Sequence, residues 1–259
     1  MAQLIRKALR AVFNYDPSFC DMYEDAHARA VAAEYLHHIK QHLQECLGDQ
    51  RLTILDAGCQ AGRLLIPLAQ EGHRVIGLDT SRFVLQRARR HARQQGLSIQ
   101  LHQGSMAALR RWIPPASLDA VLCIEVLYLC PDYQELLRLL IESVKPGGLL
   151  CISHRPTLYY VACAVVRGHG EQAAELLTRT EGRSPDGHYH NWHTQEQLLA
   201  LYRSLPLKML GCYPIDLTPL QVDRSHVTDP TVRRFLESSW KTDSTLRVPT
   251  YFLVVAQKL

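Results

Sequence analysis

The sequence predicts an α/β fold built on a doubly wound, mostly parallel sheet with helices on both faces. Two observations predict it. Beyond residue 50, short apolar runs alternate with amphipathic stretches of helical period, and this strict alternation is typical of parallel strands. Two glycines, Gly58 and Gly62, directly follow the first apolar run, as expected of a strand, a tight loop and a helix. With 259 residues and 47% hydrophobic content, the chain can bury one sizeable core, and we expect a single domain over 1–259.

The elements follow in order along the chain. The region 1–50 is predicted to be a helical cap, because apolar residues between Ala26 and Leu47 recur close to helical spacing. Seven runs are predicted as strands: 51–56, 74–79, 98–102, 118–124, 149–154, 207–213 and 251–256. Helices are predicted over 62–71, 81–95, 105–112, 132–143 and 194–204. Two stretches, 155–193 and the irregular 217–247, are expected to be insertions that build a substrate pocket, leaving 51–154 as the core.

Composition and charge exclude several classes of protein. The net charge of +4 is mild, so nucleic-acid binding is not indicated. No apolar run approaches the ~20 residues of a membrane span, and the first residues lack the apolar core of a signal peptide. The eight cysteines form no C-x-x-C pair, so neither a zinc ribbon nor another metal site is predicted. We therefore expect a reduced, cytoplasmic protein.

The two glycines and two nearby acidic residues indicate a ligand-binding loop. Asp56 ends the first strand, and Asp79 ends the second. Glycines let the backbone approach a ligand closely, and the helix that follows presents unpaired N–H groups. A glycine loop with a downstream acid is a nucleoside-binding arrangement. A dinucleotide fingerprint would place a glycine at position 60, where this chain has Gln60.

Four segments together resemble the class I S-adenosylmethionine (SAM) methyltransferases. They are the loop at 56–62, Gly77-Leu78-Asp79, the run at 118–127 and the Lys145-Pro146-Gly147-Gly148 turn. They occur in the family's order and cover residues 52–154. The chain is most similar to the small-molecule group that includes the ubiquinone and menaquinone biosynthesis enzymes. The resemblance implies a Rossmann-like fold, SAM as cofactor and S-adenosylhomocysteine as product.

The resemblance also implies which residues hold SAM. The methionine end would lie on the loop, the ribose on Asp79 and Thr80, and the adenine beside Ser105 and Met106. Cys123, Ile124 and Glu125 would line the cofactor near the sulfonium. The loop residues are Asp56, Gly58, Cys59, Gln60 and Gly62.

Three positions depart from the family pattern. Gln60 replaces a common glycine, Ser105 stands where an acid is frequent, and Leu129 stands where a histidine is frequent. A non-glycine at position 60 needs a backbone conformation that a side chain permits. Ser105 can accept a hydrogen bond from the adenine amine but carries no charge.

Methyl transfer needs mainly alignment of the acceptor, exclusion of water and removal of a proton. The fold places the acceptor beyond the carboxyl ends of the strands, which predicts Tyr128, His154 and His190 as catalytic candidates. His154 has a suitable pKa for a general base, or it is a structural histidine at a strand end. His190 belongs to a cluster with Trp192, which is expected to pack the entry of the helix capped by Thr194 against the sheet.

The arginines of one helix and two tyrosines near the start of the chain each have two interpretations. The arginines of helix 81–95 are expected to form a solvated face, with a partner-binding face as the alternative. Tyr15 and Tyr23 are either a lid over the cofactor or packing residues.

The predicted function is O- or N-methylation of a small molecule by in-line displacement, with no prediction of oligomeric state. Two alternatives stay open: a non-catalytic SAM-binding or interaction protein, and an RNA or protein methyltransferase. Residues 124–127 lack the N/D-P-P-Y/F motif of amino-methylating DNA enzymes.

Overall fold

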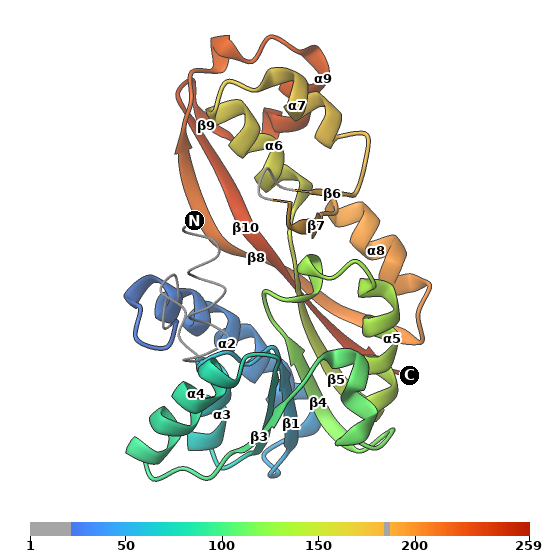
Figure 1. Cartoon of the computed structure of the whole chain (residues 1–259). Helices are drawn as coiled ribbons and strands as arrows, with labels where there is room; N and C mark the ends of the chain where they lie inside the picture. Colours follow the sequence, from blue (N-terminus) through green and yellow to red (C-terminus); the bar gives the residue numbers. More distant parts are fainter. Residues whose placement is uncertain (1–21, 184–186) are drawn as a thin grey trace. The chain divides into compact units, whose positions relative to one another are not determined.

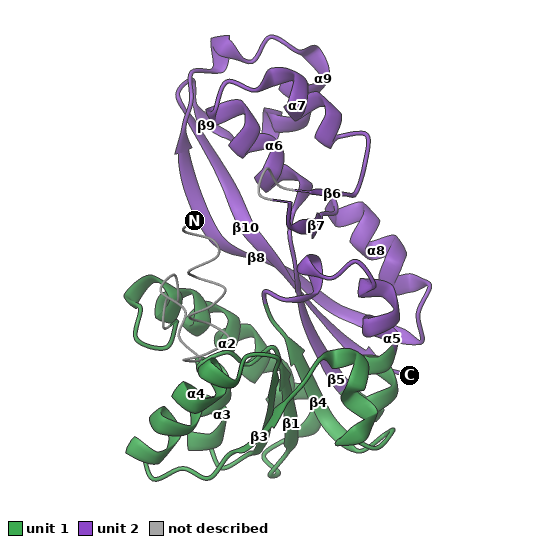
Figure 2. Cartoon of the chain, viewed as in Figure 1, with its two compact units in different colours: residues 1–124, 139–148 green, residues 125–138, 149–259 purple. Residues whose placement is uncertain are grey.

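The structure is a computed structural model that describes residues 22–183 and 187–259. The first part of the predicted cap and Tyr15 lie outside these residues. The chain divides into two compact units, shown in Figure 2. Unit 1 comprises residues 1–124 and 139–148, and unit 2 comprises residues 125–138 and 149–259.

Unit 1 begins with the predicted N-terminal helix, α2 (Ala26–Leu47). The Asp25 carboxylate starts it by accepting a hydrogen bond from the Ala28 N–H at 2.7 Å. Gly48 ends it in a positive-φ conformation. Tyr35 and Ile39 are fully buried on one face, which confirms the predicted helical period.

The sheet of unit 1 is parallel, as predicted. Its strand order is β3-β2-β1-β4, formed by β1 (Thr53–Ala57), β2 (Arg74–Asp79), β3 (Gln100–Gln103) and β4 (Leu118–Cys123). Helices α3 (Leu65–Gln70) and α4 (Arg82–Gln94) connect the strands, as Figure 1 shows. The predicted short helix at 105–112 is a 3-10 helix, η1 (Met106–Arg111). Two elements run across the division between the units, α5 (Tyr133–Ser143) and β5 (Val144–His154).

Helix α4 confirms the predicted split between an apolar and a charged face. Val84, Leu85 and Ala88 are buried, whereas Arg82, Arg89, Arg90 and Arg93 are exposed. Ser81 caps the helix, because its hydroxyl accepts a hydrogen bond from the Val84 N–H.

Unit 2 is built on antiparallel strands. Its strand order is β5-β10-β8, with β8 (Leu207–Gln221) and β10 (Thr245–Lys258) forming a long two-stranded ribbon. These three strands and the four of unit 1 account for the seven predicted strands. A short further strand, β9 (Trp240–Thr242), pairs with β10.

The prediction that 217–247 is irregular is wrong. Strand β8 continues to Gln221, and β10 already begins at Thr245. The stretch between them contains η3 (Arg224–His226), α9 (Pro230–Leu236), η4 (Glu237–Ser239) and β9. The strand predicted over 207–213 thus continues through Pro214 and Pro219. Strand β8 is the last strand in the order, where a missing N–H is tolerated.

The stretch 155–193 folds into helices and a hairpin. Helices α6 (Thr157–Val166) and α7 (Gly170–Leu176) are followed by a small hairpin of β6 (Glu181–Arg183) and β7 (Tyr189–Asn191). Between β4 and α5 lies a short 3-10 helix, η2 (Leu127–Leu129).

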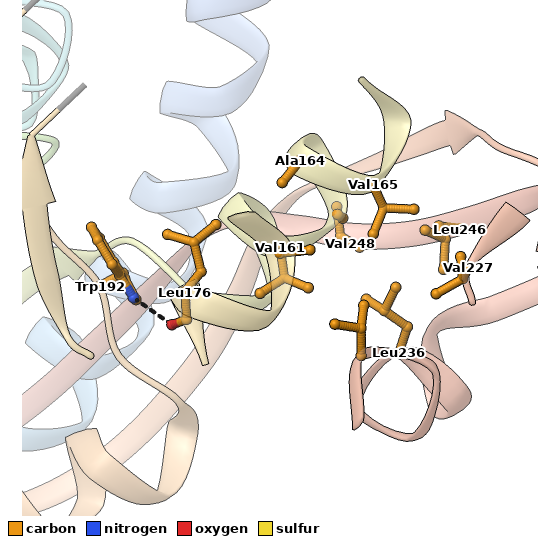
Figure 3. Close-up of a cluster of buried hydrophobic side chains, with 12 residues drawn as sticks. Val161, Ala164, Val165, Leu176, Trp192, Val227, Leu236, Leu246 and Val248 are labelled. Atoms are coloured by element: carbon orange, nitrogen blue, oxygen red, sulfur yellow. Dashed lines mark hydrogen bonds between the residues drawn. The ribbon is translucent and has the colours of Figure 1, made fainter. Parts of the chain in front are cut away.

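An apolar cluster joins these helices to the ribbon within unit 2 (Figure 3). Val161 of α6, Leu236 of α9 and Val248 of β10 are all buried in it. Trp192 is 3% exposed in the same cluster, and its Nε1 donates to the Leu176 and Arg179 carbonyl oxygens at 3.2 and 2.9 Å. The indole therefore links Leu176, at the end of α7, to the segment that follows it.

That next helix, α8 (Gln195–Arg203), confirms the predicted capping box. Thr194 accepts from the Gln197 N–H, and the Gln197 side chain accepts from the Thr194 N–H. Across the described residues, no helix combines the length and the apolar character that crossing a membrane requires.

Candidate functional site

The glycine loop of unit 1 is closed by backbone hydrogen bonds. The N–H groups of Gly58 and Cys59 both donate to the Leu78 carbonyl oxygen, at 2.7 and 3.1 Å. Gly58 and Gly62 have φ angles of 88° and 92°, which explains why the chain uses glycine at both positions. The loop is therefore held against the end of β2.

Glycine is also required for space. A Cβ on Gly62 would lie 3.0 Å from Ile66 Cδ1, and a Cβ on Gly77 would lie 2.7 Å from Cys59 Sγ. Cys59 is 3% exposed and packs over β2, so burial raises the pKa of its thiol and keeps it neutral. Cys59 thus supports the loop from within.

Gln60 adopts a backbone conformation that usually favours glycine. Its φ is 45°, inside the left-handed region, and its Oε1 accepts a hydrogen bond from the Ala61 N–H at 3.1 Å. The Gln60 N–H donates to Asp79 Oδ2 at 3.1 Å. The side-chain and backbone hydrogen bonds offset the cost of this conformation for a residue with a Cβ.

Asp79 connects the loop to the start of α4. Its Oδ1 accepts from the Ser81 N–H at 2.9 Å, and its Oδ2 accepts from Gln60. Burial raises the pKa of Asp79, while the backbone N–H groups of Ser81, Gln60 and Thr80 oppose the shift. A carboxylate offers about four acceptor positions, so these backbone N–H groups leave acceptor capacity for a ligand hydroxyl. Thr80 itself is exposed, and its carbonyl oxygen accepts from Gln103.

Asp56 lies buried beneath the loop with an arginine that sequence reasoning missed. Asp56 is 3% exposed, and burial raises its pKa to about 7, with nearby Arg63 lowering and Asp79 raising it. Arg63 is 9% exposed, and its Nη1 donates to the Ala28 carbonyl oxygen of α2 at 3.3 Å. The signal in the sequence was a cation directly after the second loop glycine.

The residues predicted beside the adenine and the sulfonium lie at the ends of β3 and β4. Ser105 Oγ starts η1 by accepting from the Ala107 N–H at 3.2 Å. Met106 Sδ lies 3.8 Å from Cys123 Sγ, and both side chains are buried. Ile124, directly after β4, is 4% exposed. The structure thus brings Met106 and Cys123 together and uses Ser105 as a helix cap.

In unit 2, Glu125 and Tyr128 follow at a strained turn. Glu125 has a φ of 63°, and its N–H donates to Ser153 Oγ at 2.5 Å. A non-glycine residue in this region is often found at functional sites. Tyr128 is 6% exposed, and burial raises the pKa of its hydroxyl.

Arg155 is the centre of an aromatic cluster that the sequence did not reveal. Its guanidinium lies over the rings of Tyr128, Tyr159 and Tyr251, at 5.1, 4.4 and 4.1 Å from their centroids. It donates to the Thr250 carbonyl oxygen and to the Tyr251 hydroxyl at 3.0 and 3.1 Å. Its Nε is buried and has no hydrogen-bond partner among the described residues.

His154, the candidate base, is 1% exposed. Its Nε2 is 2.9 Å from the Tyr202 hydroxyl of α8. Burial and, to a smaller extent, the nearby His193 lower its pKa to about 3. A neutral, enclosed imidazole of this kind favours the structural alternative weighed above.

His190 faces a different set of groups in unit 2. Its Nδ1 is 2.9 Å from the Tyr160 hydroxyl, and its ring stacks with Tyr128 at 6.3 Å. His193, three residues on, lies 3.3 Å from the Tyr133 hydroxyl, and burial lowers its pKa to about 4. The described residues contain no group of three or more His, Cys, Asp or Glu side chains arranged to hold a metal ion.

Comparison with known proteins assigns the family. The family described as "Methyltransferase domain" matches residues 49–192. A ubiquinone biosynthesis O-methyltransferase of Caulobacter vibrioides is 32% identical over 184 residues, covering 69% of each chain. The enzyme of the same name from Methylocella silvestris is 43% identical over 99 residues, covering 38% of each chain.

The fold agrees with this assignment. A SAM-dependent methyltransferase of Methanosarcina mazei superposes with a TM-score of 0.58 over 86% of this chain and 97% of its own, at 18% identity. The protein is thus a Rossmann-like α/β protein by fold. The chain belongs to the methyltransferase-domain family, which confirms the predicted resemblance to class I SAM methyltransferases of the ubiquinone type.

Proposed function

We propose that the chain transfers the methyl group of SAM to an oxygen atom of a small-molecule acceptor. The observation that carries this proposal is the loop at 58–62, which is tied to the Leu78 carbonyl oxygen and to Asp79. The relatives named ubiquinone biosynthesis O-methyltransferases favour oxygen over nitrogen, although the first of them aligns with this chain over only 38% of its length.

The residues of unit 1 fit SAM. The positive-φ glycines leave the face of the loop without side chains, and Asp79 retains acceptor positions for two ribose hydroxyls. The backbone at Gly58, Cys59 and Gln60, with Asp56 beneath it, would hold the methionine end. Met106, beside Cys123, would pack on the adenine. When bound, SAM supplies a methyl group already activated by a sulfonium.

The residues of unit 2 would orient the acceptor. We assign this role to Tyr128 and His190, whose rings stack, and add Arg155, which lies over the Tyr128 ring. Arg155 would stabilise the negative charge on the accepting oxygen once that oxygen has released its proton to bulk solvent. His154 we assign to structural support, because its imidazole is enclosed against Tyr202 and its pKa is about 3.

A turnover assay tests the proposal. The purified chain is incubated with SAM and a panel of phenols, alcohols and amines, and S-adenosylhomocysteine and methylated product are measured by mass spectrometry. We expect product with at least one hydroxyl acceptor and none with the Asp79→Ala variant. SAM binding without turnover on any acceptor would favour the non-catalytic alternative, and methylation of amines alone would contradict the choice of oxygen.

Two variants separate the roles in unit 2. Arg155→Gln is expected to lower kcat by about tenfold or more with unchanged affinity for SAM, because a charge-assisted contact is lost. His154→Gln is expected to keep kcat within about twofold. A full loss of turnover in a folded His154→Gln protein would restore His154 as the base.

A further inference from the structure

Unit 2 contains a pocket whose polar lining is strongly cationic. It lies among α6, α7 and the β6–β7 hairpin, and its volume is about 110 Å³. Three arginines line it, one from the end of α6 and two from the segment after α7: Arg167, Arg179 and Arg183. Ala164, Leu176 and Trp192 supply an apolar wall. Among the described residues that line the pocket, none is acidic.

The charges of the three arginines are only partly compensated. Arg179 pairs with Glu175 at 3.1 Å, and Arg183 Nη1 donates to the Gly187 carbonyl oxygen at 2.8 Å. The structure records no ion pair for Arg167 within residues 22–183 and 187–259. Three cations and one anion leave a balance of about +2, and each guanidinium has five N–H donors, so most of them remain for a ligand.

The size of the pocket restricts the group that can enter. A cavity of 150 Å³ holds benzene, and one water occupies about 30 Å³ of liquid. A pocket of about 110 Å³ therefore holds one small polar group and a few carbon atoms, while a larger molecule extends outwards. Guanidinium groups match the geometry of carboxylate and phosphate oxygens.

The pocket continues into the residues assigned to the acceptor. Tyr160 and His190 both line it, and the Tyr160 hydroxyl is 2.9 Å from His190 Nδ1. His190 in turn stacks with Tyr128. A ligand anchored by the arginines would therefore extend along Tyr160 and His190 toward Tyr128.

We propose that this pocket binds the carboxylate or phosphate group of a small molecule, and that this molecule is the methyl acceptor. The identification of this molecule as the methyl acceptor rests on the proposed methyl transfer, whereas anion binding rests on the pocket alone. The arginines select for the oxyanion, and Trp192 and Leu176 contact the carbon atoms next to it.

Calorimetric titration of the full chain at low salt tests the proposal with three probes: phenyl phosphate, benzoate and benzyl alcohol. We expect at least one of the two anions to bind at least tenfold more tightly than the neutral alcohol, and the stronger anion identifies the oxyanion. The Arg167→Gln/Arg179→Gln double variant should weaken anion binding by at least tenfold. Arg203→Gln, a substitution of an exposed arginine of α8 outside the pocket, is the matched control and should leave it unchanged.

Equal anion affinity in the double variant and the wild type would overturn the site, as would equal binding of benzyl alcohol. Circular dichroism checks the fold of the variants, and raising the salt concentration on the wild type gives a readout without mutation, because screening weakens the anions alone. A SAM titration of the same variant separates the two proposals. Weakened anion binding with normal SAM binding and turnover in the double variant refutes the assignment of the methyl acceptor to this pocket, and anion binding in a wild-type chain that does not bind SAM refutes the methyl transfer.

Discussion

The glycine loop of unit 1 and the Arg155 cluster of unit 2 are built in opposite ways. The loop is made of consecutive residues, and backbone N–H groups and one carboxylate hold it in place. The cluster takes side chains from four separate segments, and its contacts are ring faces and a guanidinium. The geometry of the loop thus depends on a short stretch of chain, whereas the geometry of the cluster depends on the packing of separate segments.

The largest expected effect is on the free energy of unfolding, and it compares a tryptophan in the buried core of unit 2 with a half-buried tryptophan of unit 1. Trp192→Ala removes a 3% exposed indole and two hydrogen bonds, and we expect a loss of about 3–5 kcal/mol in the free energy of unfolding. Trp112→Ala, which alters a half-buried ring of unit 1, is the control and should cost clearly less. Urea unfolding measures both, and equal losses would contradict the description of the cluster around Trp192.

The buried histidines of unit 2 predict a pH dependence of stability. The folded-state pKa values of His154 and His193 are about 3 and about 4, below the ordinary value of 6.5. Below pH 6.5 the unfolded chain therefore binds protons that the folded chain does not. The free energy of unfolding therefore decreases as the pH is lowered. Each histidine should contribute a loss of about 2 kcal/mol between pH 6.5 and 5.

Chemical unfolding at a series of pH values measures this loss. The His154→Gln variant should show a shallower decline over the same range, because one of the two titrating groups is gone. A variant with the same slope as the wild type would show that His154 is accessible to protons in the folded chain, and would reopen its role as a base.

The smallest expected effect concerns the start of α8. Thr194→Ala removes one half of the capping box, and we expect it to cost about 1 kcal/mol. Thr194→Ser keeps the hydroxyl and should restore most of the stability. Thermal unfolding compares the two, and an alanine variant as stable as the wild type would mean that the cap adds nothing to the packing around Trp192.

The conformation of the glycine loop could be predicted from the sequence because its parts are neighbours in the chain. Gly58 and Gly62 signalled their backbone conformation directly, and Asp79 is separated from them by one helix and one strand. The role of Arg63 was missed, since its contact with the Ala28 carbonyl oxygen depends on how α2 packs.

The cluster of unit 2 could not be predicted in the same way. Tyr159 and Tyr251 are 92 residues apart in the chain and meet at Arg155 only because α6 and β10 pack together. The two strands of the ribbon were predicted over 207–213 and 251–256, but not their extensions to Gln221 and from Thr245. The extension of β8 contains Pro214 and Pro219, which an edge strand accommodates. Local patterns predict a backbone site well, and distant side-chain contacts require the fold.

A calorimetric titration of SAM against the wild type, Asp79→Asn and Asp79→Ala tests the central claim most directly, because this carboxylate holds the loop and is proposed to bind the ribose of SAM. We expect SAM to bind the wild type, Asp79→Ala to bind more than about tenfold more weakly, and Asp79→Asn, which keeps one acceptor oxygen, to lie between them. No binding of SAM to the wild type at millimolar concentration, or equal affinity in all three proteins, would contradict it.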